Sequence, residues 1–144
     1  MHSYTSEPTS SLKFSIITAT YNSADTIDSC LDSIASQTYR NIEHIVIDNL
    51  SSDNTLEKIK EHSFKHSKII SEKDGGIYDA LNKGIKNSTG DIIGFLHSDD
   101  FFSDSKVIEN IIKVFEDNDT LSAVYGDCEF FSKTNTKKTI RKWQ

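Results

Sequence analysis

The sequence predicts an α/β fold in which helices cover both faces of a mostly parallel sheet. Short apolar runs rich in β-branched residues alternate with segments whose apolar residues recur at helical spacing. The 144 residues suffice for one domain of this kind, and right-handed crossovers through the helices would make successive strands parallel. We therefore expect the carboxyl ends of the strands to share one edge of the sheet.

Five short apolar runs, each bounded by polar or glycine-containing turns, are typical of strands in a buried sheet. They lie at residues 14–19, 43–48, 68–71, 91–96 and 121–125. The segment that follows, residues 128–143, contains two extended stretches around a polar turn, and we expect a hairpin there. Residues 1–12 are polar and are expected to form a disordered leader.

Between these runs, apolar residues recur every three or four positions and indicate amphipathic helices. The helices are predicted at residues 25–36, 53–62, 77–85 and 107–115. Side chains that can accept hydrogen bonds from the first helical N–H groups precede three of them, namely Ser23 or Asp25, Asp53 and Asp104. Cys30 falls on the apolar face of the first helix, so we expect it to pack in the core.

Charge and apolar content exclude several classes of protein. Sixteen basic and twenty-two acidic residues give a net charge of −6, which disfavours a nucleic-acid binder held by phosphate contacts. No run approaches the roughly 18 apolar residues of a membrane-spanning helix, and residues 1–13 lack the apolar stretch of a secretory signal. We therefore expect a cytoplasmic protein.

Polar and acidic residues follow each of the first four predicted strands. In open α/β sheets, ligands bind beyond the carboxyl ends, and a strand order of 3-2-1-4 would bring these four ends to one crevice. An acidic crevice repels phosphate unless a divalent cation lies between them, and Mg²⁺ or Mn²⁺ takes one or two carboxylates together with substrate phosphates. The predicted cation ligands are Asp99 and Asp100.

Each acidic group also has a purely structural explanation, because aspartates are common in turns and at the beginnings of helices. No glycine-rich dinucleotide motif or P-loop follows the first strand. A nucleotidyltransferase would need a glycine-rich, basic loop at that point. A response-regulator receiver would need paired acids where Asn22 stands and a lysine where Gly126 stands. A binding domain without activity is the remaining alternative.

Four segments, in this order and spacing, resemble the donor-binding half of family 2 glycosyltransferases. The closest branch is the one that builds bacterial surface polysaccharides such as O-antigen and colanic acid. The segments are residues 14–22 (FSIITATYN), 46–55 (VIDNLSSDNT), 74–84 (DGGIYDALNKG) and 90–100 (GDIIGFLHSDD). The resemblance covers about residues 13–143 and implies the GT-A fold, a Rossmann-like sheet of the kind predicted above.

The resemblance implies a role for each strand end in binding the donor. Thr20 and Tyr21 would line the nucleotide pocket, and Asp48 would hydrogen-bond the base, typically uracil. Asp74 would lie near the ribose and the pyrophosphate, with Asn82 in support from the following helix.

The same resemblance assigns the cation, Mn²⁺ or Mg²⁺, to Asp99, with Asp100 as the second choice. This chain departs from the family pattern at two positions. His97 replaces the first acid of the Asp-x-Asp motif, and Asn49 stands where many relatives have a second acid. Fewer charges would therefore face the cation.

The implied reaction is transfer of a sugar, with inversion, from a nucleotide-diphosphate sugar, most simply a UDP-sugar. The acceptor would be a sugar or lipid-linked hydroxyl in polysaccharide or glycolipid synthesis, and the basic residues in 137–142 would allow contact with the inner face of the membrane. Family members continue past the fifth strand, so residues 13–144 are expected to lack the acceptor half, with the general base beyond Gln144 and not at Asp127. The alternative is a fragment that binds nucleotide-sugar but is catalytically inert.

Overall fold

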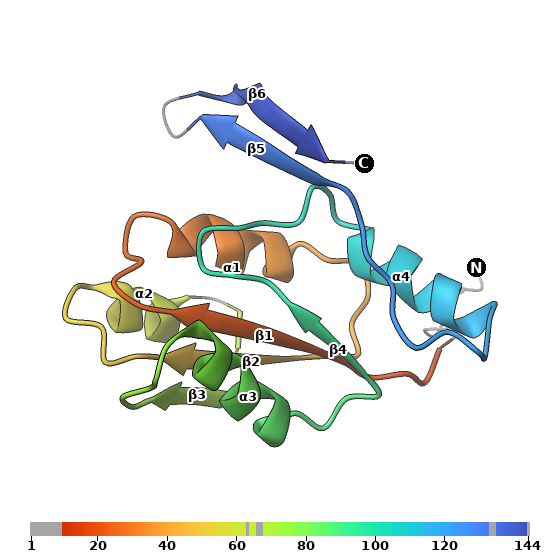
Figure 1. Cartoon of the computed structure of the whole chain (residues 1–144), viewed down its shortest axis with the longest axis horizontal. Helices are drawn as coiled ribbons and strands as arrows, with labels where there is room; N and C mark the ends of the chain where they lie inside the picture. The colour runs from red at the N-terminus through yellow and green to blue at the C-terminus, as the bar shows by residue number, and fades with distance from the viewer. Residues whose placement is uncertain (1–9, 63, 66–67, 133–134, 144) are drawn as a thin grey trace, which may run out of the picture. The chain divides into compact units, whose positions relative to one another are not determined.

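A computed structural model describes residues 10–62, 64–65, 68–132 and 135–143 (Figure 1). Residues 1–9 of the predicted leader lie outside the described part. Strands and helices alternate as predicted through the first eight elements. The elements are β1 (Phe14–Thr20), α1 (Ile27–Ala35), β2 (Ile42–Asp48), α2 (Thr55–Glu61), β3 (Lys68–Ser71), α3 (Ile77–Asn87), β4 (Ile92–Phe95), α4 (Val107–Glu116), β5 (Cys128–Ser132) and β6 (Asn135–Trp143).

The first four strands form one parallel sheet in the order β3-β2-β1-β4, which is the order that would bring the four strand ends to one crevice. Thr20 at the end of β1 pairs with Asp48 at the end of β2, and Asp48 pairs with Ser71 at the end of β3. Figure 1 shows β1 and β2 running in the same direction toward the loops that lead into α1 and α2. Three carboxyl ends therefore lie side by side.

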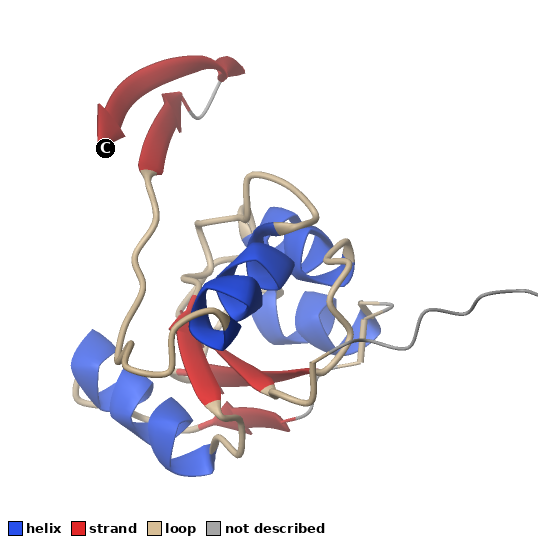
Figure 2. Cartoon of the chain, turned by 90° about the vertical axis from the view of Figure 1, so that its right-hand side faces the viewer, coloured by secondary structure: helices blue, strands red, loops and turns tan. Residues whose placement is uncertain are grey.

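Helices lie on both sides of this sheet, as predicted (Figure 2). The larger apolar cluster joins one face of β1 and β2 to α1, α2 and α4, with Ile16, Leu31 and Ile112 among its buried members. The smaller cluster joins Ile45 and Ile47 on the opposite face to α3. Successive strand residues point to opposite faces, so nearly continuous burial of β1 and β2 requires both layers.

Cys30 lies fully buried in the larger cluster, as its position on the apolar face predicts. Burial raises the pKa of this thiol to about 12, and the hydrogen bond with Thr18 only partly opposes that rise. The thiolate that a nucleophile or soft metal ligand needs is therefore strongly disfavoured.

The beginnings of the helices differ in part from the prediction. Neither Ser23 nor Asp25 caps α1 through its side chain; instead the Ser23 carbonyl accepts the N–H groups of Thr26 and Ile27, at 3.0 and 2.9 Å. At α2, the Asp53 carboxylate does accept the Thr55 N–H at 3.0 Å.

The chain divides into two compact units, Met1–Lys113 and Val114–Gln144. In the second unit, β5 and β6 pair antiparallel, which confirms the predicted hairpin. The strand predicted at residues 121–125 is wrong, because that segment has no regular structure and Tyr125 is 97% exposed. An apolar, β-branched run becomes a strand only where a neighbouring strand can pair with it. The side chains of residues 132–144, including the basic tail, lie outside the described part.

None of the described helices combines the length and the apolar character that crossing a bilayer requires.

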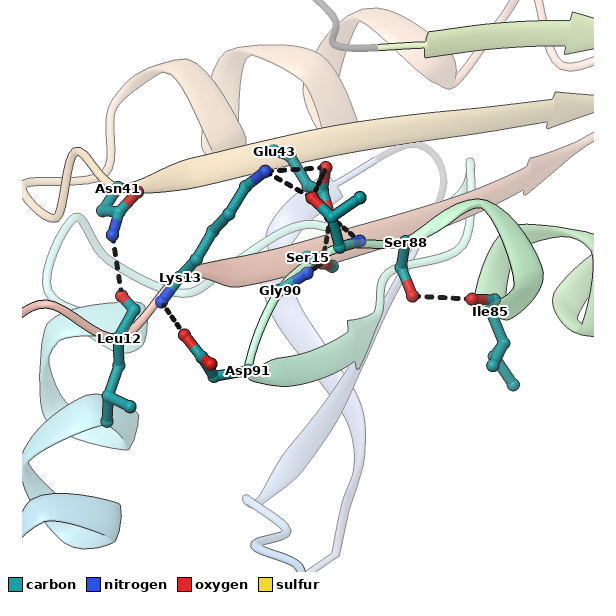
Figure 3. A network of polar contacts seen from close by, with 10 residues as sticks. Leu12, Lys13, Ser15, Asn41, Glu43, Ile85, Ser88, Gly90 and Asp91 are labelled. Carbon is teal, nitrogen blue, oxygen red and sulfur yellow. Dashed lines mark hydrogen bonds and ion pairs between the residues drawn. The ribbon is translucent and has the colours of Figure 1, made fainter.

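A polar network closes the amino-terminal edge of the sheet, on the side away from the carboxyl ends (Figure 3). The buried Glu43 carboxylate accepts hydrogen bonds from the hydroxyls of Ser15 and Thr89 and pairs with Lys13 Nζ at 3.0 Å. The Thr89 N–H also donates to it. Ser15 Oγ in turn accepts the Gly90 N–H at 2.8 Å. The buried charge of Glu43 is therefore fully compensated by residues of this edge.

These bonds make Glu43 a source of pH-dependent stability. Burial by itself would raise the pKa of Glu43, but the bonds from Ser15, Thr89 and Lys13 outweigh it and lower the pKa to about 2. Because the folded pKa lies below the ordinary glutamate value of 4.5, this stabilisation is complete above pH 4.5 and is lost between there and pH 2.

We predict that Glu43→Gln lowers the free energy of unfolding at pH 7 by up to about 3 kcal/mol, with the difference from native shrinking as pH falls from 4.5 toward 2. Urea unfolding across this pH range measures it. Glu57→Gln, at an exposed position on α2, is the control and should track the native protein. A constant difference between Glu43→Gln and native at every pH would contradict the ionic role of Glu43.

Candidate functional site

The carboxyl ends of β1, β2, β3 and β4 lie along one edge of the sheet, called here the carboxyl edge. The loops after β1 and β2 run side by side at this edge. The Asn49 N–H donates to the Thr20 carbonyl at 3.0 Å. The Asn22 N–H donates to Ser51 Oγ at 2.9 Å, and Asn22 Oδ1 accepts the Ser52 N–H at 2.8 Å. Asn22 adopts a left-handed conformation with φ 47°, which asparagine tolerates better than most residues. Sequence alone did not indicate these cross-links.

Asp48 is fully buried where the two loops begin. Its carboxylate accepts the Ser51 N–H at 3.1 Å, the Ser51 hydroxyl at 2.5 Å and the Ser71 hydroxyl at 2.7 Å. A carboxylate offers about four acceptor positions, so these three bonds leave about one for a ligand. The turn-forming explanation of Asp48 is therefore correct, and its contact with a base stays a prediction.

The turn between β3 and α3 is attached to the same edge. Asn49 Oδ1 accepts the Asp74 N–H, Asp74 Oδ1 accepts the Gly76 N–H, and Asp79 Oδ2 accepts the Gly75 N–H, each at 2.9 Å. Gly76 has φ 112°, a conformation that favours glycine. Both glycine amides are therefore used inside the turn and not presented to a phosphate.

Lys83 braces this turn from α3 and was missed by sequence reasoning. Its ammonium donates to the Lys73 carbonyl at 2.8 Å and pairs with Glu72 at 3.0 Å and with Asp79 at 3.5 Å. The bond to Glu72 is the main reason that the pKa of Lys83 is raised. The four-residue spacing of Asp79 and Lys83 on a predicted helix was the available signal.

The end of β4 joins the site through serine hydroxyls. Ser98 is buried, and its hydroxyl lies 2.8 Å from that of Ser23 in the loop after β1. The following residues, Asp99 and Asp100, are exposed at this point. Although Asp100 as a whole is exposed, local desolvation of its carboxyl group and the neighbouring charge of Asp99 raise its pKa, whereas His97 opposes the rise. Two carboxylates thus repel each other beside the end of β1.

These carboxylates fit one kind of cation site. The described part of the chain holds no cluster of three or more His, Cys, Asp or Glu side chains suited to a metal ion. Asp99 and Asp100 instead offer hard oxygen ligands of the number that Mg²⁺ or Mn²⁺ takes when phosphate oxygens complete its shell. The donor set therefore suits a cation shared with a bound diphosphate.

The other predicted residues differ in their surroundings. Tyr21 is 59% exposed, whereas Thr20 is buried and its hydroxyl lacks a hydrogen-bond partner among the described residues. Asp74 is half-buried within its turn. Asn82 is exposed on α3, and no hydrogen bond within the described ranges links it to the strand ends. The structure thus brings together Thr20, Tyr21, Asp48 and Asp74, but it does not connect Asn82 to them.

Comparison with known proteins identifies the family. Residues 15–143 match the family described as Glycosyl transferase family 2, and the chain therefore belongs to it. An uncharacterized glycosyltransferase of Mycobacterium tuberculosis is 37% identical over 119 residues, which cover 82% of this chain and 45% of that protein. A UDP-Glc:alpha-D-GlcNAc-diphosphoundecaprenol beta-1,3-glucosyltransferase, WfgD, of Escherichia coli is 35% identical over 122 residues, covering 84% of this chain and 47% of WfgD. The chain spans about half the length of these relatives, and the matched residues cover less than half of each.

Solved structures confirm the GT-A fold. TarS 1-349 of S. aureus in complex with UDP-GlcNAc has a TM-score of 0.68 and 27% identity, covering 74% of this chain and 32% of that one. The mannosyltransferase PcManGT of Pyrobaculum calidifontis, in complex with GDP-Man and Mn²⁺, has a TM-score of 0.69 and 27% identity, covering 76% of this chain and 34% of that one.

The bonds to Asp48 predict a structural penalty when its charge is removed. In Asp48→Asn, a side-chain amide would replace the carboxylate that now accepts hydrogen bonds from Ser51 and Ser71. The amide NH₂ group cannot accept these bonds, and the Ser51 N–H can only donate. We expect the free energy of unfolding to fall by about 1–3 kcal/mol.

Urea unfolding at pH 7 measures this penalty, with Asp25→Asn, an exposed aspartate before α1, as the matched control. Equal stabilities of the two variants would show that Asp48 does not hold the carboxyl edge.

Proposed function

We propose that the carboxyl edge of this sheet binds a nucleotide-sugar donor, specifically a UDP-sugar, for an inverting, metal-assisted sugar transfer. The observation that carries the proposal is the joining of three loops at that edge. Ser23 and Ser98 connect the ends of β1 and β4, and Asn22 and Ser51 connect the loops after β1 and β2. The exposed side chains of Tyr21, Asp99 and Asp100 therefore lie on loops that hydrogen bonds hold together.

The nucleoside would lie against the loops after β1 and β2. The exposed ring of Tyr21 offers a flat face on which a base can stack. Thr20 would contribute its backbone beneath that ring. Asp48 would direct its remaining acceptor position toward a base N–H, held in place by Ser51 and Ser71.

The ribose and pyrophosphate would lie near the turn after β3. Asp74 would face them, with Asn82 in support from α3. Because the amides of Gly75 and Gly76 already donate to carboxylates, this turn presents acidic groups and not amides to the ligand. The positive charge that neutralises the diphosphate therefore has to come from a group outside this turn.

Asp99, with Asp100 beside it, would hold Mn²⁺ or Mg²⁺ for that purpose. A cation bound there would supply positive charge against the negative charge that develops on the departing diphosphate. The complex of PcManGT with GDP-Man and Mn²⁺ supports this choice. The role of these two side chains is to hold and orient, and the exposed position of both leaves their oxygens available.

The whole protein would use this site to build a polysaccharide or glycolipid. The name of WfgD specifies a UDP-Glc donor and a diphosphoundecaprenol acceptor, which supports a UDP-sugar and a lipid-linked acceptor here. Such an acceptor would bring the protein to the inner face of the cytoplasmic membrane.

No described residue is assigned as the general base. The second candidate, nucleotide-sugar binding without transfer, is distinguished by product analysis with labelled UDP-sugars.

Calorimetric titration of the 144-residue chain with UDP, with and without Mn²⁺, tests the proposal. We expect Mn²⁺ to tighten UDP binding at least tenfold, because an acidic edge repels an uncompensated diphosphate. Asp99→Asn, which keeps the shape but removes the charge, should abolish most of that Mn²⁺ effect.

Asp117→Asn, an exposed aspartate beyond α4, is the matched control and should bind as the native chain does. An unchanged Mn²⁺ dependence in Asp99→Asn would contradict the cation assignment, and absence of UDP binding by the native chain would contradict the proposed function.

A further inference from the structure

Leu50 adopts a backbone conformation that its side chain disfavours. Asn22 and Leu50 are the non-glycine residues with positive φ in the described part of the chain, at 47° and 53°. Asparagine populates this left-handed region readily, but a bulky aliphatic residue does so rarely because its Cβ approaches the following carbonyl oxygen. Folding therefore carries a conformational cost at Leu50.

Packing does not account for this cost. The Leu50 side chain is 55% exposed and belongs to neither apolar cluster of the described structure. The hydrogen bonds that shape the loop come from its neighbours, Asn49 and Ser51. Glycine would adopt this φ with less strain, and a polar side chain would be better solvated at this exposed position. An outlier of this kind points to a function outside the fold itself.

The cross-links between the two loops bring the segment that carries Leu50 next to the segment that carries Tyr21. On one side of the pair, the Asn49 N–H bonds to the Thr20 carbonyl; on the other, the Asn22 N–H bonds to Ser51 Oγ. Tyr21 lies between Thr20 and Asn22, just as Leu50 lies between Asn49 and Ser51. Both side chains are more than half exposed, and we call Tyr21 and Leu50 on these adjoining loops the apolar lip.

We propose that Leu50 is a binding residue that contacts the planar base of the donor nucleotide, together with Tyr21 of the apolar lip. This inference rests on the proposed function. A heterocyclic base has apolar faces that suit a tyrosine ring and an aliphatic side chain, whereas the diphosphate is charged and the sugar is covered with hydroxyls. Leu50 also lies two residues along the chain from Asp48, the group proposed to meet the edge of the base.

Leu50→Gly separates this role from a structural one, because it removes the apolar contact and relieves the left-handed conformation together. We expect Kd to rise roughly fivefold, as for a partly buried leucine contact, and by the same factor for UMP and for UDP. The thermal midpoint of unfolding should stay the same or increase. Leu50→Met, which keeps apolar reach, should restore a Kd within about twofold of native.

Calorimetry with UMP, UDP and a UDP-sugar in the presence of Mn²⁺ supplies the binding data. If native binds UDP and Leu50→Gly binds it equally well, the assignment of Leu50 is wrong while the proposed function stands. A loss confined to the UDP-sugar would place Leu50 against the sugar and overturn the base contact. A lower thermal midpoint in Leu50→Gly would show that Leu50 is structural. Failure of the native chain to bind either nucleotide would instead contradict the proposed function.

Discussion

The carboxyl edge of the sheet depends on the buried carboxylate of Asp48. Burying a charge is costly unless donors surround it, and here Ser51 and Ser71 provide them from the loop after β2 and from the end of β3. Ser51 also accepts the N–H of Asn22, which extends the network to the loop after β1. One buried charge thus holds three neighbouring strand ends in fixed relation, and the exposed groups of the candidate site stand on that framework.

The two edges of the sheet differ in whether their carboxylates are paired with positive charge. At the amino-terminal edge, Glu43 is matched by Lys13 and by hydroxyl and amide donors, so nothing there calls for a ligand. At the other edge, no lysine or arginine of the described ranges pairs with Asp99 or Asp100. An unbalanced pair of carboxylates beside an exposed aromatic ring is what a cation-bridged nucleotide diphosphate would complement.

Much of the fold followed from the sequence, because alternating strand and helix patterns leave few ways to bury both faces of a sheet. The parallel sheet with helices on both faces was predicted correctly for this reason. The hairpin at 128–143 was also predicted correctly, from two extended stretches around a polar turn. The strand at 121–125 was wrong because local composition cannot reveal whether a pairing partner exists. In the site, residue types at strand ends indicated Asp48 and Asp99, and the spacing of Asp79 and Lys83 could have indicated their ion pair. The cross-link through Asn49 and the left-handed φ of Leu50 arise from tertiary geometry that no local pattern encodes.

The most direct test of the account is an NMR map of where UDP and Mn²⁺ meet this chain. Backbone amide shifts on adding UDP should concentrate in residues 20–23, 48–52 and 74–79, and substoichiometric Mn²⁺ with UDP should broaden the amides of residues 97–100 most strongly. Changes centred instead on the network around Lys13, Glu43 and Thr89 would contradict the claim that the carboxyl edge of the sheet is the donor site.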